Sequence, residues 1–216
     1  MEPKADMFWF RRFMPKILIG EELKDLKLAI LASGDLSYII KYGIPLVSSH
    51  QNKAKDVKLI INCIGCKRQL VKTIICILLR VNDLDNVYFT ECNYSNMPPP
   101  SNDGNMCFLR TLRFEVGRLI QEASKCDLLI IDIDALIGEN LGKRLRELQG
   151  SQTDMAIGSI EEVLGKTLFE VYRTNPYPWK VAKAGFAYFS GNPKGVKALS
   201  MVCSNLFNNR DNIPPY

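Results

Sequence analysis

Two aspartates stand two positions apart in the segment Asp132-Ile133-Asp134, directly after the apolar run at residues 127–131. In a strand, side chains two positions apart point to the same side, so we expect the two carboxylates to lie close together. Neighbouring carboxylates repel each other unless a cation joins them, and Mg²⁺ and Mn²⁺ prefer oxygen ligands. Asp132 and Asp134 are therefore candidate metal ligands, and the ion would in turn hold a diphosphate. In the alternative interpretation, one aspartate caps the following helix and the other is solvated.

The segments around this motif predict an α/β fold. Apolar segments of strand length alternate with segments of helical periodicity, which is typical of a mostly parallel sheet with helices on both faces. Strands are predicted at residues 28–32, 57–63, 87–91, 127–131, 154–158 and 184–189. Helices are predicted from Ser33-Gly34-Asp35 through Tyr42 and at residues 66–79, 107–124, 140–148 and 193–207. The apolar run at 127–131 indicates a strand buried on both faces, and ligands bind at the carboxyl ends of such strands.

Other segments set the expected domain organisation. Residues 1–27 are interpreted as an N-terminal extension, and residues 28–216 as one domain. Residues 93–105, with three consecutive prolines, are predicted to be irregular and to form a loop near the site or a plain surface excursion. Residues 161–180 are also predicted to be irregular, and the segments 93–105 and 159–180 would border the entrance to the site. The tail after residue 207 stops in a loop, so we expect that the chain lacks the C-terminal part of such a domain.

Composition and charge narrow the classes of function. The net charge is +5 and the basic residues are mixed with 23 acidic ones, so we expect no nucleic-acid partner and an anionic small substrate instead. No apolar run reaches the length of a membrane span, and the polar start of the sequence leads us to expect no secretory signal. The seven cysteines lie mostly in apolar runs, which predicts reduced, buried thiols and a cytoplasmic location. The aromatic and basic segment Phe8–Met14 could lie on a membrane surface or pack on its own domain.

A series of segments follows in a fixed order along the chain. They are Ala32-Ser33-Gly34-Asp35 with Tyr38, then Ile44–Ser49, Arg113-Phe114, Cys126–Ile137 with its D-x-D motif, Asp154–Gly158 and Ala184–Ser190. In this order they resemble a glycosyltransferase of the GT-A type, over about residues 28 to 206. The D-x-D motif alone is a weak signal, whereas its place in the ordered series is moderately specific.

The resemblance implies a GT-A-like, Rossmann-like fold. It also implies transfer of a sugar from a nucleotide-diphosphate donor to a saccharide, lipid or protein acceptor. Asp134 would bind Mn²⁺ or Mg²⁺ directly, and Asp132 would contact the metal or the ribose. The metal would stabilise the negative charge of the diphosphate leaving group.

The resemblance also implies further binding residues. Ala32, Asp35 and Tyr38 would border the nucleotide base. Arg113 would steady the site or hold a phosphate through paired hydrogen bonds. Ala184-Gly185 would let the sugar approach the backbone closely.

Other functions fit parts of the sequence. A non-catalytic relative would keep the fold for binding or assembly. The D-x-D motif could also belong to a phosphatase of the haloacid-dehalogenase type, but Leu136 stands where that motif has Thr or Val. Cys63-Ile64-Gly65-Cys66 could be a redox pair at a helix N-terminus, although buried thiols fit the apolar context better. The only histidine, His50, is expected to be a surface or core residue rather than a metal ligand.

Overall fold

The computed structural model describes residues 16–19, 26–66, 68–80, 84–92, 102–159 and 182–208. These residues form one seven-stranded sheet in the order β1-β4-β3-β2-β5-β7-β6. The strands are β1 (Lys16–Ile19), β2 (Leu28–Gly34), β3 (Lys58–Ile64), β4 (Val87–Cys92), β5 (Asp127–Asp132), β6 (Met155–Ser159) and β7 (Ala182–Phe189). The helices are α2 (Leu36–Lys53), α3 (Arg68–Leu79), α4 (Asn102–Ser124), α5 (Leu141–Gly150) and α8 (Pro193–Asn208).

The strand order reverses at the centre of the sheet. From β2 the chain moves outward through α2 to β3 and through α3 to β4, with each strand parallel to the one before. Helix α4 then returns the chain to β5, which pairs parallel with β2 on its other side. Strand β7 pairs antiparallel with both β5 and β6, and β1 pairs antiparallel with β4. The predicted mostly parallel α/β sheet is therefore confirmed. Ligands of such sheets bind in the crevice at the reversal, which lies here between β2 and β5.

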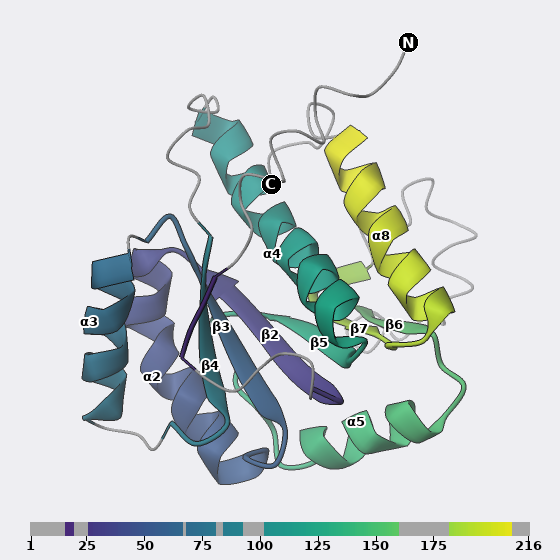
Figure 1. Cartoon of the computed structure of the whole chain (residues 1–216), viewed down its shortest axis with the longest axis horizontal. Coiled ribbons are helices and arrows are strands. Elements are labelled where there is room, and N and C mark those ends of the chain that lie inside the picture. Colours follow the sequence, from purple (N-terminus) through teal and green to yellow (C-terminus); the bar gives the residue numbers. More distant parts are fainter. Residues whose placement is uncertain are drawn as a thin grey trace.

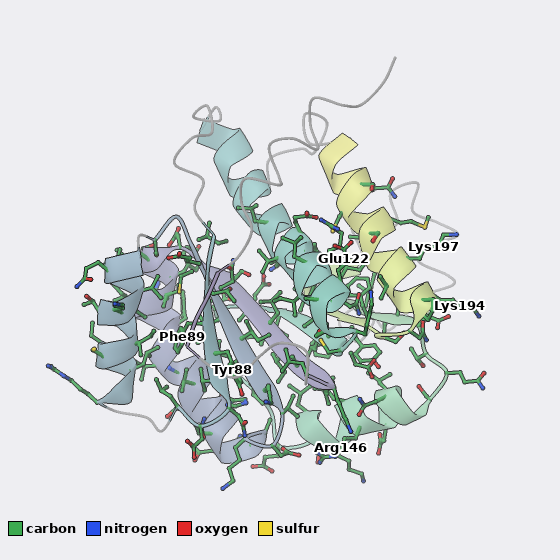
Figure 2. All side chains as sticks on the ribbon, in the orientation of Figure 1. Tyr88, Phe89, Glu122, Arg146, Lys194 and Lys197 are labelled. Atoms are coloured by element: carbon green, nitrogen blue, oxygen red, sulfur yellow. The ribbon has the colours of Figure 1, made fainter. Side chains whose placement is uncertain are left out.

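Helices cover both faces of the sheet, as predicted (Figure 1). On one face, side chains such as Ile30 and Phe89 form a core with α2, α3 and α5. On the other face, side chains such as Leu31 and Tyr88 form a second core with α4 and α8. Neighbouring residues of a strand alternate between the two cores. Tyr88 and Phe89 of β4, both labelled in Figure 2, are an example. This alternation fixes which strand-end side chains lie beneath α4.

Helix α4 packs closely on the centre of the sheet at Gly117. A Cβ atom at Gly117 would lie 2.8 Å from Cδ1 of Ile130 and 3.0 Å from Cδ2 of Leu128, so only glycine fits without a shift of these side chains. One helical turn before Gly117 stands Arg113, and one turn after it stands Gln121. The Gln121 amide is fully buried and its Nε2 donates to the carbonyls of Cys126, Phe189 and Ser190. Helix α4 is thus anchored to the amino end of β5 and to the end of β7.

The structure also differs from the sequence-based expectations. Residues 102–105, predicted to be irregular, form the first turn of α4, which begins five residues earlier than expected. Strand β1 (Lys16–Ile19) lies within residues 1–27, which were expected to form an N-terminal extension. It pairs antiparallel with β4 at the edge of the sheet, and Lys16 stands opposite Glu91. The segments 93–101 and 161–180 lie outside the described residues. Within the part of the chain that the structure covers, no helix has the length and apolar character of a membrane span.

The single histidine is a core residue, as expected. His50 is fully buried near the end of α2, and its Nε2 lies 2.6 Å from the carbonyl oxygen of Val57. Burial lowers the pKa of His50 below its ordinary value of 6.5. The neutral imidazole therefore joins α2 to the start of β3 and is not placed at the reversal of the strand order.

We expect acid to destabilise the fold partly through His50. The folded chain protonates His50 at a lower pH than the unfolded chain, so the unfolded state binds more protons as the pH falls below about 6.5. The free energy of unfolding should therefore fall by up to about 1.4 kcal/mol per pH unit from this group. Urea unfolding measured at several pH values should show a shallower pH dependence for His50→Gln than for the wild type. Equal slopes would contradict the role assigned to His50.

Candidate functional site

The candidate site lies at the carboxyl ends of β2 and β5. Asp132 is the last residue of β5 and stands directly opposite Ser33 of β2 in the sheet register. Asp132 stands two residues after Ile130, and Ser33 stands two residues after Leu31. Because Ile130 and Leu31 belong to the core under α4, the side chains of Asp132 and Ser33 also lie on the α4 face of the sheet. The backbone then turns, because the Ala135 N–H donates to the Asp132 carbonyl at 3.1 Å. The motif therefore ends a buried strand at the reversal of the strand order.

Arg113 of α4 supplies a positive charge directly beside this strand end. Its Nη1 donates to Oδ1 of Asp132 in an ion pair. The Arg113 side chain is only 7% exposed, whereas that of Asp132 is 46% exposed. A buried guanidinium needs a paired negative charge, so Arg113 fixes the position of Asp132 while the carboxylate still faces solvent. The sequence pattern pointed to both residues but not to their contact.

Gly185 of β7 borders the same carboxylate. A Cβ atom at Gly185 would lie 3.0 Å from Cγ of Asp132 and closer still to its Oδ2. The space that a side chain would occupy at position 185 is therefore filled by the Asp132 carboxylate. The glycine was predicted as a point of close approach for a sugar, which stays a prediction; in the structure it lies against Asp132. Ala184 is the preceding residue of β7.

Asp134 does not lie in the strand, which corrects the premise that strand alternation brings the two aspartates together. Strand β5 ends at Asp132, and Ile133 and Asp134 belong to the turn that follows. Ile133 is buried, and a Cβ at Gly34 would lie 3.2 Å from its side chain. Asp134 is exposed beside this buried contact. Its place near Asp132 therefore comes from the turn.

The carboxylates fit a metal only as part of a site shared with a ligand. Among the described residues, no group of three or more His, Cys, Asp or Glu side chains is placed to hold an ion. Mg²⁺ usually takes one or two protein carboxylates together with substrate phosphates and water. The exposed Asp134 and the half-exposed Asp132 match that donor set. A dedicated metal cage made of these residues alone is not supported.

The residues predicted to border a base occupy different environments. Asp35 caps α2, because its Oδ1 accepts from the Tyr38 N–H at 3.0 Å and from the Ser37 hydroxyl at 2.8 Å. Tyr38 is 40% exposed, and its ring lies 5.7 Å from that of Tyr42. Ala32 is fully buried in the core beneath α2. Asp35 and Tyr38 are therefore at the rim of the site, whereas Ala32 lies below it.

The C-x-x-C motif consists of buried thiols, as expected. Cys63 and Cys66 are both free and buried, and burial raises the pKa of each thiol. Gly65 between them has a φ of 68°, which lets the chain turn sharply after β3. Raised thiol pKa values leave little reactive thiolate, which argues against a redox function at this position.

Sequence reasoning missed a set of residues that support the site. Gly117 sets the distance of α4 from the sheet, and a glycine inside a helical pattern signals such close approach. Asn62 and Thr90 extend the row of Ser33 and Asp132 across the sheet. No local sequence pattern marks them, because their importance depends on the register between strands.

The described fold is similar to that of solved glycosyltransferases. The galactosyltransferase LgtC, in complex with donor and acceptor sugar analogues, matches with a TM-score of 0.54 and 15% identity over 88% of this chain and 67% of that one. The bifunctional glycosyltransferase WbbM matches with a TM-score of 0.49 and 12% identity over 86% of this chain and 37% of that one. The glycosyltransferase GlyE of Streptococcus pneumoniae TIGR4 matches with a TM-score of 0.47 and 11% identity over 87% of this chain and 40% of that one.

These matches assign a class of fold. The chain has the α/β fold of GT-A-type glycosyltransferases, as the resemblance predicted, and among these three structures the assignment depends on LgtC. The chain spans less than half the length of WbbM and GlyE. No protein-family model matches the sequence, and no curated protein matches it.

Replacing Gly185 by alanine should break the Arg113–Asp132 contact. The new methyl group would occupy the position of the Asp132 carboxylate, which would have to move away from Arg113. We expect the free energy of unfolding to fall by about 1–3 kcal/mol. Gly150→Ala is the matched control, because nothing lies within 4 Å of a Cβ there. Urea unfolding of both variants tests this, and equal stabilities would show that Asp132 can move without consequence.

Proposed function

We propose that the chain is a glycosyltransferase that binds a nucleoside-diphosphate sugar and a divalent cation at the carboxyl ends of β2 and β5. The observation that carries the proposal is the position of Asp132. It ends a central strand at the reversal of the strand order, is held by the buried Arg113 and remains half exposed. The match to a galactosyltransferase fold supports the same class of reaction.

The two aspartates have different tasks in this proposal. Asp134 is exposed and would bind the cation, and the diphosphate would complete the coordination. Asp132 would contact the cation or the ribose. When bound, a divalent cation supplies Lewis-acid stabilisation of the negative charge that develops on the diphosphate leaving group.

Arg113 would orient Asp132 and reduce repulsion. Its guanidinium holds one carboxylate oxygen of Asp132, and the other oxygen lies against Gly185. Its positive charge also offsets the repulsion between this carboxylate and an arriving diphosphate. The barely exposed Arg113 side chain has little freedom to leave this position.

The base would bind at the rim formed by the start of α2. Tyr38 offers an exposed aromatic ring with an apolar face, which suits stacking on a nucleotide base. Asp35 fixes the first turn of α2 by capping it, and so holds Tyr38 in place. Direct contact of Ala32 with the base would need the backbone rather than its buried side chain.

Calorimetry with uridine diphosphate and Mn²⁺ tests the proposal. We expect heat of binding when both are present and little heat with Mn²⁺ alone, because the described carboxylates do not form a cage by themselves. Asp134→Ala should abolish this binding, since it removes the exposed ligand of the cation. Absence of heat with any nucleoside diphosphate would favour a non-catalytic protein with this fold.

A matched aspartate variant controls for loss of surface charge. Asp56 is exposed, lies before β3 and pairs with Arg146 of α5, which is labelled in Figure 2. Exposed ion pairs contribute little to stability, so Asp56→Ala should bind like the wild type. If Asp134→Ala also binds like the wild type, the site is not at Asp134.

A further inference from the structure

A row of polar side chains crosses the sheet beneath α4. The sheet register places Thr90 of β4 opposite Asn62 of β3, Asn62 opposite Ser33 of β2, and Ser33 opposite Asp132 of β5. Each stands two residues after a member of the core under α4, so all four side chains lie on that face. The next position, Gly185 of β7, has no side chain and borders Asp132. The row therefore leads from the interior to the candidate site.

Hydrogen bonds join only part of this row directly. The Thr90 hydroxyl donates to Oδ1 of Asn62 at 2.9 Å, and both residues are buried. Arg113 donates to Asp132 at the other end. Among the described residues, however, neither Nδ2 of Asn62 nor Oγ of Ser33 has a hydrogen-bond partner, although both atoms are buried. Buried polar atoms nearly always have a partner, either protein or ordered water.

The strand register allows the two side chains to share one water molecule. Neighbouring strands lie about 4.8 Å apart, and two hydrogen bonds of about 2.9 Å through one oxygen span such a gap. The Asn62 amide can donate, and the Ser33 hydroxyl can both accept and donate. A buried water needs at least two polar partners, and these residues supply them.

We propose that Asn62 and Ser33 bind a buried water molecule, which fixes the Ser33 side chain beside Asp132. Thr90 donates to Asn62, Asn62 donates to the water, and the water donates to Ser33. Ser33 then keeps its own hydroxyl proton, and a rotation of its side chain would let it donate to Asp132, which stands opposite it on the next strand. Ser33 and Asn62 are thus positioning residues, because they act on a ligand through the orientation of Asp132.

A high-resolution crystal structure of the full, ligand-free chain tests the water directly. We expect a density peak within about 3 Å of both Nδ2 of Asn62 and Oγ of Ser33. In Ser33→Ala that peak should be lost and the Asp132 carboxylate should be less well ordered. A wild-type structure without the peak would overturn the proposal. This arm does not depend on the proposed glycosyltransferase function.

Binding measurements test the effect on the site, and this arm does rest on the proposed function. Ser33→Ala should weaken binding of uridine diphosphate with Mn²⁺ about threefold to tenfold, the usual consequence of losing one hydrogen bond. Its melting temperature should stay close to that of the wild type. The control is Ser124→Ala, which removes a part-buried hydroxyl on α4 that donates to the Ile120 carbonyl away from the site.

The outcomes separate the two proposals. If the wild type binds no nucleotide but the water peak is present, the proposed function fails and the water site stands. If the wild type binds nucleotide and Ser33→Ala binds equally well, the positioning role is wrong. A loss of affinity in Ser124→Ala as large as that in Ser33→Ala would also overturn the positioning role, because it would point to a general effect on α4.

Discussion

The close contact between α4 and the centre of the sheet is the constraint on which the site depends. Gly117 allows this contact, because a side chain there would collide with Ile130 and Leu128. The same approach buries Arg113 one turn earlier, and a buried guanidinium requires a negative partner. Asp132 at the end of β5 is that partner. Gln121 fixes the other end of the contact through three backbone carbonyls, so the helix cannot easily shift along the strand.

Strand β5 begins with Asp127 and ends with Asp132, and the contacts of these two aspartates give them different roles. Asp127 accepts from the Gly191 N–H at 2.6 Å and from the Tyr188 hydroxyl at 3.0 Å, so both of its oxygens are occupied by protein groups. Asp132 receives one described ion pair and keeps nearly half of its side chain exposed at the reversal of the strand order. Only Asp132 combines a fixed position with access for a ligand.

The sequence predicted the sheet and its helices because burial sets their periodicity, as at Ile30 and Leu31, which face opposite cores. The helix start at Asp35 was also predictable, since the cap is a local interaction. The end of β5 at Asp132 was not, because the turn that carries Asp134 outward leaves no pattern in a D-x-D motif. The contact between Arg113 and Asp132, and the pairing of Lys16 with Glu91, depend on tertiary register rather than on neighbouring residues.

The central claim is that a nucleoside diphosphate binds at the carboxyl edge of the sheet, with its phosphates beside Asp132 and Asp134 and its base beside Tyr38. A crystal structure of the chain soaked with uridine diphosphate and Mn²⁺ tests it most directly. The account predicts an ion between Asp134 and the diphosphate, with the base beside Tyr38 and the Arg113–Asp132 pair intact. Well-ordered nucleotide bound elsewhere, or a metal held by other residues, would contradict it.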